Sequence, residues 1–318
     1  MSTKGRHDDG IAQAAWLYFV GNLSQQQVSD RLGISRFKVN RMLMEARDQG
    51  MVRISVEHRT SVTLALADRL AHAFGLDEVQ VAPVHAPTQD QDFERTAVGI
   101  LAANYLARVA SGDQRHVIGV GWGRTLSAMA DNVSGLSNRN LTFVSLMGSA
   151  THATRTAPGV VCVRLAAQTG GKAMLLPAPF VADDEAACEA ILGQRLVRET
   201  LMVARHASHA MMSVGECRDG AILLESGIFS PDQMAELRHN NVVGDCCGVF
   251  FTADGAVADI TLNRCTPCVK PAEMGNMDVV LMAGGVTKAV ATLAVLRAGF
   301  ANRLMIDETL ARAVLDQV

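Results

Sequence analysis

A glycine-rich turn followed by a basic residue is the segment best suited to hold an anion. It runs His116-Val-Ile-Gly-Val-Gly-Trp-Gly-Arg-Thr-Leu-Ser-Ala-Met-Ala130 and predicts a short strand, a tight turn and a helix. Gly121 and Gly123 let the backbone approach a ligand closely. Arg124 and Thr125 fall at the helix start, where free N–H groups and the helix dipole attract negative charge. Because tight turns that bind no ligand also contain Gly-x-Gly, the turn alone is weak evidence for an anion-binding site.

Six further candidates for binding a polar ligand come at or near the ends of predicted apolar strands. They are Gly148, Ser149, Asp245, Lys288, Asp307 and Glu308. Together with the turn they suit a phosphorylated polyhydroxy compound. Backbone N–H groups, Arg124 and Lys288 would hold the phosphate, and the carboxylates would accept hydrogen bonds from sugar hydroxyls.

Several of these candidates also have a purely structural interpretation. Trp122 lies between the two glycines and is a candidate for the pocket, but it equally fits a packing role. Lys288 fits a solvated residue in the first turn of a helix, and Asp245 fits a turn cap. Either carboxylate of the Asp307-Glu308 pair fits the N-cap of a final helix over residues 309–318. The sequence leaves both interpretations open.

The order of the predicted elements indicates how these residues are positioned. Predicted strands cover residues 79–84, 116–120, 142–148, 173–179, 210–215, 246–255 (with a tight Asp-Gly turn at its end), 278–285 and 303–308, and predicted helices cover 60–75, 93–110, 185–204 and 288–296. Strands that end in glycine or a carboxylate and lead into helices predict a doubly wound α/β domain with helices on both faces of a parallel sheet. Ligands bind such sheets outside the carboxyl ends of the strands.

Residues 24–49 predict a different unit, two short amphipathic helices joined by a tight turn. Ser24 and Gln27 form a capping box, Gly33 suits a left-handed residue after the first helix, and Ser35 caps the second. Val39 and Leu43 give the second helix its buried face. This arrangement is typical of a helix-turn-helix, in which the start of the second helix reaches the edges of DNA bases.

Six residues of this segment are candidates for contact with DNA. They are Ser35, Arg36, Lys38, Asn40, Arg41 and Arg47. Arginine suits guanine and asparagine suits adenine, whereas Lys38, Arg41 and Arg47 could instead neutralise phosphates. Residues 31–59 hold seven basic and three acidic side chains, a net charge of +4, on a chain whose net charge is −3. A basic segment on an acidic chain favours nucleic-acid binding over a helical pair that is basic by coincidence.

The segments on either side of this pair complete a first domain over residues 1–58. Residues 11–20 predict a helix that packs under the pair, with Trp16 and Phe19 as its expected buried anchors. Residues 51–56 alternate apolar and polar, which predicts a strand that serves as a small wing or leads out of the domain. Residues 59–318 then form the larger domain.

Composition excludes several classes of protein. The chain has 318 residues, 49% hydrophobic and 4% aromatic, and lacks both an apolar signal segment and a run long enough to cross a membrane. We therefore expect a cytoplasmic protein. Seven cysteines indicate reduced thiols. The Cys265-Thr-Pro-Cys268 pair could be half a metal site or a redox pair, or only small packing side chains. No histidine spacing indicates a metal site, and no cofactor is predicted.

Taken in order, four motifs resemble the SorC/DeoR-type sugar-sensing transcription regulators. They are Leu32-Gly-Ile-Ser-Arg-Phe-Lys-Val-Asn-Arg-Met-Leu43, Gly119-Val-Gly-Trp-Gly-Arg-Thr-Leu126, Gly244-Asp-x-x-Gly-x-Phe-Phe251 and Ala283-Gly-Gly-x-x-Lys288, followed by the Asp307-Glu308 pair. The resemblance covers residues 12–316. It implies a bacterial regulator of sugar or polyol catabolism that acts as a homodimer or homotetramer. Its effector domain would be similar to sugar-phosphate isomerases and deaminases.

The resemblance also implies roles for individual residues. Gly121, Gly123, Arg124 and Thr125 would form a phosphate loop, with Lys288 in the effector pocket and Asp307 and Glu308 near it. This chain departs from the family at Gly148-Ser149, where Gly-Gly is frequent, in the run Cys265–Pro271, and at Ile306, where the family often has threonine. The first two departures leave room for an unphosphorylated polyol, and the third weakens the assignment of the Asp307-Glu308 loop to the pocket.

An enzyme is the competing hypothesis. A sugar-phosphate isomerase with an appended DNA-binding domain would use the same pocket, with a carboxylate as the base that moves a proton between carbons. The exposed face of the second helix discriminates the two hypotheses, because a metabolic enzyme has no use for four such residues on one helix face, namely Arg36, Lys38, Asn40 and Arg41.

Overall fold

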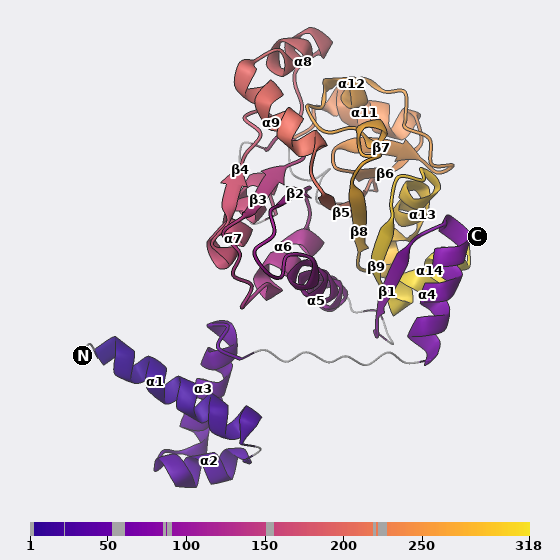
Figure 1. The fold of residues 1–318 in the computed structure, drawn as a ribbon. Coiled ribbons are helices and arrows are strands. Elements are labelled where there is room, and N and C mark those ends of the chain that lie inside the picture. The colour runs from indigo at the N-terminus through magenta and orange to yellow at the C-terminus, as the bar shows by residue number, and fades with distance from the viewer. Residues whose placement is uncertain are drawn as a thin grey trace. The chain divides into compact units, whose positions relative to one another are not determined.

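The computed structural model divides the chain into two compact units, Met1–His58 and Arg59–Val318 (Figure 1). The residues that it describes are 3–21, 23–52, 61–84, 87, 91–150, 156–218, 221 and 228–318. In this part of the chain, no helix is both long enough and apolar enough to span a membrane.

The first unit contains the predicted helical pair. Helix α1 (Thr3–Ala15) continues into the π-helical turn η1 (Trp16–Val20), and α2 (Gln25–Leu32) and α3 (Arg36–Asp48) follow. The capping box at Ser24 is present, Gly33 is left-handed with φ of 64°, and the Ser35 hydroxyl accepts a hydrogen bond from the Lys38 amide at 3.3 Å. These local signals lie within a few residues of one another, and the structure confirms them.

The core of the first unit differs from the sequence prediction at Trp16. Ile11, Leu17, Val39 and Leu43 are among the buried residues, whereas 61% of Trp16 is exposed. The prediction that Trp16 is a buried anchor is therefore wrong, and Leu17 takes this role. Phe19 is half-buried. The wing predicted over residues 51–56 lies largely outside the described residues, and residues 51 and 52 form no strand.

The second unit is built on a parallel sheet of seven strands in the order β1-β9-β8-β5-β2-β3-β4. The strands are β1 (Glu78–Ala82), β2 (His116–Val120), β3 (Leu141–Ser145), β4 (Lys172–Met174), β5 (His209–Glu216), β8 (Asp278–Ala283) and β9 (Arg303–Asp307). Each neighbouring pair on this path is parallel.

Helices cover both faces of this sheet (Figure 1). Val280 and Met282 of β8 pack in one hydrophobic cluster with α5 (Asp92–Val109), α6 (Arg124–Asn132) and α7 (Pro158–Thr169). The alternate residues Val279, Leu281 and Ala283 pack in the other, with α4 (Ser61–Phe74), α9 (Arg195–Arg205), α13 (Ala289–Arg297) and α14 (Glu308–Leu315). Because both faces of β8 are buried, its sequence is apolar without alternation. The predicted doubly wound α/β domain is confirmed.

Two segments depart from their predicted elements. The strand predicted after Gly244 is a hairpin of β6 (Val242–Cys246) and β7 (Val249–Thr252), whose turn residues Cys247 and Gly248 both have positive φ. Strand β6 pairs antiparallel with the end of β5, which brings Asp245 opposite Gly215. The helix predicted over 185–204 is two helices, α8 (Glu185–Leu192) and α9, interrupted at residues 193–194. The predicted Asp-Gly turn at Gly255 is present, with φ of 92°.

The remaining short elements lie in the connections between strands. They are α11 (Pro231–His239), α12 (Thr261–Cys265), η2 (Pro271–Glu273) and η3 (Val286–Lys288). Asp307, at the end of β9, accepts hydrogen bonds from the Leu310 amide at 3.0 Å and from the Gly285 amide at 2.7 Å. One fully buried carboxylate therefore caps α14 and fixes the start of η3.

We predict that Asp307→Ala lowers the free energy of unfolding by about 2–4 kcal/mol, because a cap is lost and a buried amide loses its acceptor. Asp184→Ala is the matched control, since Asp184 also caps a helix, α8, but holds no second amide. Its expected cost is about 1 kcal/mol. Urea unfolding measures both values, and equal losses would contradict the second role of Asp307.

Candidate functional site

A pocket lies at the carboxyl ends of β2 and β5, beside β6 and the residues that follow β8. Its volume is about 620 Å³, counted out to the open solvent at its mouth. The lining residues are Trp122, Gly123, Arg124, Thr156, Phe180, Ser213, Val214, Gly215, Glu216, Ala221, Asp245 and Lys288. The size suits a small ligand. Its position at this edge of the sheet is where parallel α/β domains bind ligands.

The turn after β2 approaches β5 so closely that only one of its two candidate glycines is sterically required. Gly123 has φ of 144°, and a Cβ at this position would lie 2.0 Å from the Ser213 hydroxyl oxygen. That hydroxyl donates a hydrogen bond to the Trp122 carbonyl at 2.8 Å. A Cβ on Gly121 would meet its nearest atom at an ordinary 3.6 Å. Gly123 therefore sets the path of the turn.

Arg124 begins helix α6 and lines the pocket without a hydrogen bond or ion pair to another described residue. Burial, and next the charge of Arg95, lower the pKa of its guanidinium, which nevertheless stays protonated at neutral pH, as arginine does in proteins. The amides of the first turn of α6 lack partners within the helix. The pocket thus contains a cation and a helix start that can both bind an anion.

Thr125, predicted for the same role, is fully buried and absent from the pocket lining. Its hydroxyl has no hydrogen-bond partner among the described residues. Arg124 therefore faces the pocket, whereas Thr125, the next residue in the sequence, does not.

Lys288 is a buried lysine whose Nζ atom donates a hydrogen bond to the Val214 carbonyl at 2.7 Å. Burial is the main cause that lowers the pKa of Lys288 to about 8, and the nearby charge of Arg95 acts in the same direction. The carboxylates of Glu216 and Asp245 raise the pKa and partly oppose these effects. Lys288 is therefore still mostly protonated at pH 7 but loses its proton under mildly alkaline conditions.

Two carboxylates share the pocket with Lys288. Asp245 lies opposite Gly215, where an added Cβ would come 1.9 Å from the Asp245 Oδ1 atom. Burial raises the pKa of Asp245 to about 6. Burial also acts to raise the pKa of Glu216, but hydrogen bonds from Arg218 and Thr287 outweigh it and leave the pKa below the ordinary value. Both groups are ionised at neutral pH and can accept hydrogen bonds from hydroxyl groups.

Aromatic rings form the apolar side of the pocket. Trp122 and Phe180 meet edge to face, with ring centroids 5.0 Å apart. The indole N–H of Trp122 donates to the Thr156 hydroxyl at 3.2 Å, which fixes the ring. Such a ring pair can pack against the C–H groups of a carbohydrate while the charged residues bind its oxygens.

The other predicted pocket residues lie outside the lining. Gly148 packs against the Pro179 carbonyl, where a Cβ would come 1.9 Å from the oxygen, and Ser149 exchanges backbone hydrogen bonds with residues 178 and 180. These two residues therefore position the loop that carries Phe180. Asp307 caps α14 as described above, and Glu308 pairs with Arg312 at 2.7 Å.

Sequence reasoning missed seven lining residues, which are Thr156, Phe180, Ser213, Val214, Gly215, Glu216 and Ala221. Glu216 could have been found, because it directly follows the predicted strand over residues 210–215 and so falls at its carboxyl end. Ser213 lies inside that strand, and its contact with Trp122 depends on the pairing of β5 with β2. Thr156 and Phe180 belong to long connections whose path the local sequence does not specify.

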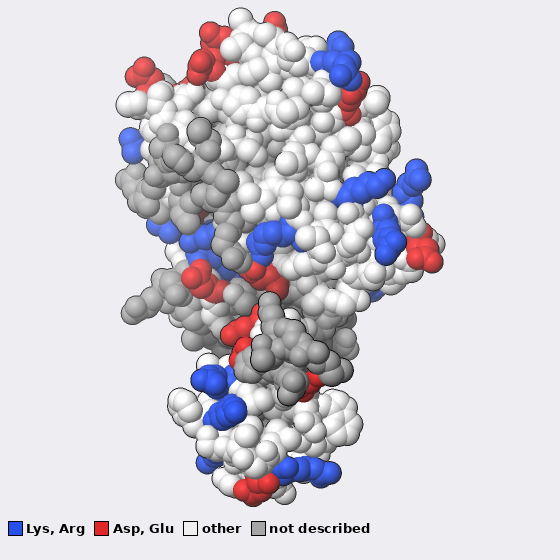
Figure 2. All heavy atoms as spheres, turned by 90° about the vertical axis from the view of Figure 1, so that its left-hand side faces the viewer, with Lys and Arg blue, Asp and Glu red and all other residues white. Residues whose placement is uncertain are grey.

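The candidate residues for contact with DNA lie on one exposed helix. Arg36, Lys38, Asn40, Arg41 and Arg47 of α3 and its cap, Ser35, are all exposed to solvent. The guanidinium of Arg47 lies over the Phe19 ring, 5.3 Å from its centroid. Figure 2 shows basic side chains on the surface of the protein. The helix therefore presents the polar, basic surface that its sequence predicted.

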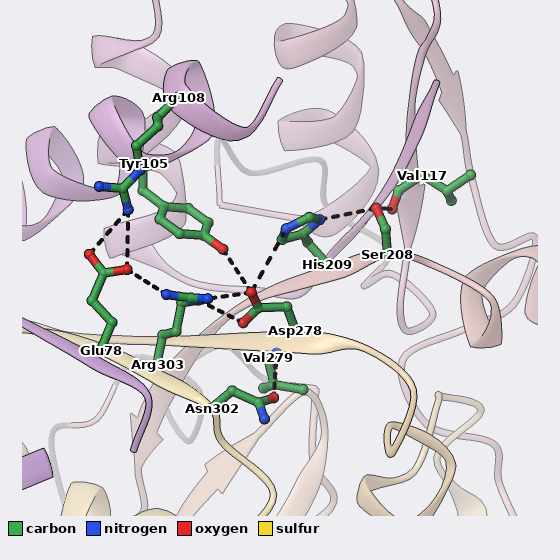
Figure 3. A network of polar contacts seen from close by, with 10 residues as sticks. All are labelled: Glu78, Tyr105, Arg108, Val117, Ser208, His209, Asp278, Val279, Asn302 and Arg303. Carbon is green, nitrogen blue, oxygen red and sulfur yellow. Dashed lines mark hydrogen bonds and ion pairs between the residues drawn. The ribbon is translucent and has the colours of Figure 1, made fainter. Parts of the chain in front are cut away.

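A second polar cluster lies at the opposite, amino edge of the sheet (Figure 3). Asp278, at the start of β8, accepts hydrogen bonds from Arg303 at 2.9 Å and from the Tyr105 hydroxyl at 3.2 Å. Glu78 pairs with Arg108 at 3.1 Å and also with Arg303. Burial and the charge of Asp278 raise the pKa of Tyr105, so its hydroxyl stays a donor. This network joins β1, β8 and β9 to α5 and has a structural role.

The cysteines give no indication of a metal or redox site. Cys265 and Cys268 are buried free thiols, and burial raises the pKa of each, which makes them poor nucleophiles. Among the described residues, no group of three or more histidines, cysteines or carboxylates is placed to hold a metal ion.

Comparison with known proteins identifies relatives over nearly the whole chain. The family described as "Putative sugar-binding domain" matches residues 58–316. The erythritol catabolism regulatory protein EryD of Brucella abortus is 32% identical over 98% of this chain and 98% of its own length. The deoxyribonucleoside regulator of Bacillus subtilis is 30% identical over 96% of this chain and 97% of its own length.

Solved structures share the fold. The full-length sorbitol operon regulator SorC from Klebsiella pneumoniae has a TM-score of 0.74 at 23% identity, over 96% of this chain and 97% of that one. A DeoR family transcriptional regulator from Listeria monocytogenes has a TM-score of 0.73 at 24% identity, over 80% of this chain and 100% of that one.

We predict that Gly123→Ala lowers the free energy of unfolding by about 2 kcal/mol or more, since its backbone conformation is almost restricted to glycine. The new Cβ would also displace Ser213 and the Trp122 carbonyl. Gly121→Ala is the matched control and should change stability by less than about 1 kcal/mol. Trp122 fluorescence in a Trp16→Phe background, together with urea unfolding, measures both effects. Equal tolerance of the two substitutions would contradict the described turn.

Proposed function

Because this chain belongs to the SorC/DeoR-type family of sugar-binding transcriptional regulators, we propose that it binds operator DNA and that a small carbohydrate ligand controls this binding. The first unit would contact the DNA through α3. The pocket of the second unit would bind the effector, which is a sugar, a polyol or a sugar phosphate. Relatives named for erythritol and for deoxyribonucleosides support this range of ligands.

The observation that carries the effector proposal is that two cations, Arg124 and Lys288, line the same pocket and both keep N–H groups that can donate to a ligand. Arg124 has no ion pair among the described residues, and within the same part of the chain the Lys288 side chain donates a single hydrogen bond, to the Val214 carbonyl. An anionic group such as a phosphate would bind these two cations and the first-turn amides of α6. Asp245 and Glu216 would accept hydrogen bonds from hydroxyl groups, and Trp122 would pack against the carbon frame.

The pocket residues proposed from the sequence divide into two roles. Trp122, Gly123, Arg124, Asp245 and Lys288 line the cavity formed by the described residues. The others lie outside this lining and would act only indirectly; they are Gly121, Thr125, Gly148, Ser149, Asp307 and Glu308. Asp307 is the clearest case, because its bond to the Gly285 amide fixes the segment that leads to Lys288.

On the DNA side, the exposed residues of α3 divide by the chemistry of their contacts. Arg36, Asn40 and Arg41 have side chains that can read base edges in the major groove. Lys38, Arg47 and the Ser35 cap lie where a helix-turn-helix contacts phosphates. The protein would act in the cytoplasm as a homodimer or homotetramer, because two recognition helices read two half-sites.

Control by the effector requires only a modest energy difference. An effector that binds one subunit arrangement about 100-fold better than the other shifts the equilibrium between them by about 2.7 kcal/mol. The chain needs no metal or cofactor for this function. We also infer that the pocket binds its ligand without turnover, and an assay for isomerase activity on a panel of sugar phosphates tests this inference. Sustained turnover would refute it.

The direct test of the proposed function is fluorescence anisotropy with labelled DNA from upstream of the protein's own gene. The titration is repeated with sugars, polyols and their phosphates at fixed salt. We expect tight binding that exceeds binding to random DNA and that one compound in the panel shifts. Binding to the upstream DNA that shows no preference over random DNA in any condition would refute the proposal that the protein is a regulator.

Two substitutions should separate the two functions. Arg41→Ala is expected to weaken operator binding about 10-fold or more and to leave effector affinity unchanged. Lys288→Met is expected to weaken binding of a phosphorylated effector about 10- to 100-fold, the value of a charged hydrogen bond, with DNA affinity intact. Lys270→Met is the matched control, because Lys270 also donates hydrogen bonds to backbone carbonyls but lies outside the pocket lining. An unchanged effector response in Lys288→Met would refute the pocket assignment.

The pKa of Lys288 predicts how effector affinity depends on pH. Below about pH 8 the lysine is protonated and binds the anion, and above it the cation is lost. Affinity for a phosphorylated effector should therefore fall only slightly from pH 7 to 7.5 and be about 10-fold weaker at pH 9 than at pH 7. The phosphate itself is already fully ionised in this range. Calorimetric titration at several pH values measures how effector affinity falls as the pH rises. Lys288→Met should remove this pH dependence. A pH dependence that is the same in the native protein and in Lys288→Met would contradict the role of Lys288.

A further inference from the structure

Phe37 is the most exposed large apolar side chain in the described part of the chain, with 81% of its surface accessible. It is the second residue of α3, between Arg36 and Lys38. No other ring and no cation contacts its ring among the described residues. An apolar side chain gains nothing from exposure to water, so its role is not explained by the fold of the first unit.

The position of Phe37 on α3 shows which way it faces. Residues of an α-helix are separated by about 100° around the axis. Val39, Leu43 and Ala46 are buried and define the core side of α3. Phe37 and Arg41, which are one turn apart, project to the opposite side, and Met44 continues this stripe with 53% of its surface exposed. Phe37 therefore lies at the N-terminal turn, on the side directed farthest from the core.

This is the part of a recognition helix that reaches deepest into the major groove. Base edges in that groove present hydrogen-bonding atoms and a single apolar group, the C5-methyl of thymine. A phenyl ring can donate or accept no ordinary hydrogen bond, so the thymine methyl is the group in the groove that it fits. The basic and amide residues beside it would fix the helix on the phosphates and neighbouring bases.

Resting on the proposed function of α3, we propose that Phe37 reads a thymine in each operator half-site by contact with its C5-methyl group. Burial of the methyl against the ring removes apolar surface of both partners from water. Phe37 is then a specificity-determining residue, whereas the arginines beside it supply most of the affinity. Discrimination at this position would depend little on salt, because no counterion is released by an apolar contact.

The test replaces each thymine of the selected operator, one at a time, by 2′-deoxyuridine, which removes only the methyl group. We expect the full-length native protein to lose about fourfold in affinity at one thymine in each half-site, the contribution of one buried methyl group. Phe37→Ala should bind the thymine and deoxyuridine operators with equal affinity. Phe37→Leu, which keeps an apolar side chain, should retain part of the discrimination.

Other outcomes would overturn the proposal. They are a native protein that binds the operator selectively but shows no deoxyuridine effect at any position, and a Phe37→Ala variant whose deoxyuridine effect equals that of the native protein. A Phe37→Ala variant that loses affinity equally for operator and random DNA would also overturn the proposal. So would a Phe37→Ala variant that loses self-association, since Phe37 would then contact a second copy of the chain. Failure of the native protein to select any operator would refute the proposed function itself. This outcome differs from a failure of the Phe37 proposal, in which the native protein still selects an operator.

Discussion

Three of the charged residues that line the pocket, Glu216, Asp245 and Lys288, are buried, and a buried charge is costly unless nearby groups compensate it. This constraint governs the carboxyl edge of the sheet. Lys288 is compensated by the Val214 carbonyl and by the carboxylates of Glu216 and Asp245. Those groups reach it because β5 lies beside β8 in the sheet and the antiparallel strand β6 adds Asp245 to the end of β5. Two glycines make the approach possible: Gly215 leaves room for Asp245, and Gly123 leaves room for Ser213.

An incompletely compensated site of this kind is suited to binding. Arg124 forms no ion pair with a described residue, although the charges of Asp92 and Glu216 act on it, so its guanidinium keeps donors with which an anionic ligand could pair. Ligand binding would then be coupled to the arrangement of the segments that carry these residues, namely the turn after β2, the end of β5 and the segment after β8. This offers a physical route by which a small ligand could favour one subunit arrangement over another.

Local signals in the sequence predicted more of the structure than long-range ones. The helix caps at Ser24 and Ser35 and the left-handed Gly33 depend on neighbours within a few residues, and all three were predicted. Arg124 and Lys288 were expected in the pocket because each follows an apolar strand. Ser213 and Phe180 were missed because their positions depend on strand pairing and on long connections. Trp16 was misassigned because it was chosen for its apolar ring: it follows the buried Ile11 by five residues, which places it on the other side of the helix.

Asp307 shows a second limit of sequence reasoning. It lies at the end of a parallel strand, as predicted, but its carboxylate caps α14 and holds the Gly285 amide. The position of a residue at the correct edge of a sheet does not decide whether its side chain faces a ligand or the backbone. Asp245 faces the pocket, by contrast, because β6 pairs with β5 and directs it there.

The central claim is that the pocket and the DNA-binding helix are thermodynamically coupled. Coupling is reciprocal, so an effector that changes operator affinity by a given factor must have its own affinity changed by operator by the same factor. The most direct measurement uses two calorimetric titrations of the full-length protein. In the first, effector is titrated into the protein alone and into the protein at saturating operator. In the second, operator is titrated into the protein with and without effector. We predict equal factors of about 100 in the two experiments. Effector affinity that is identical with and without operator would contradict the account.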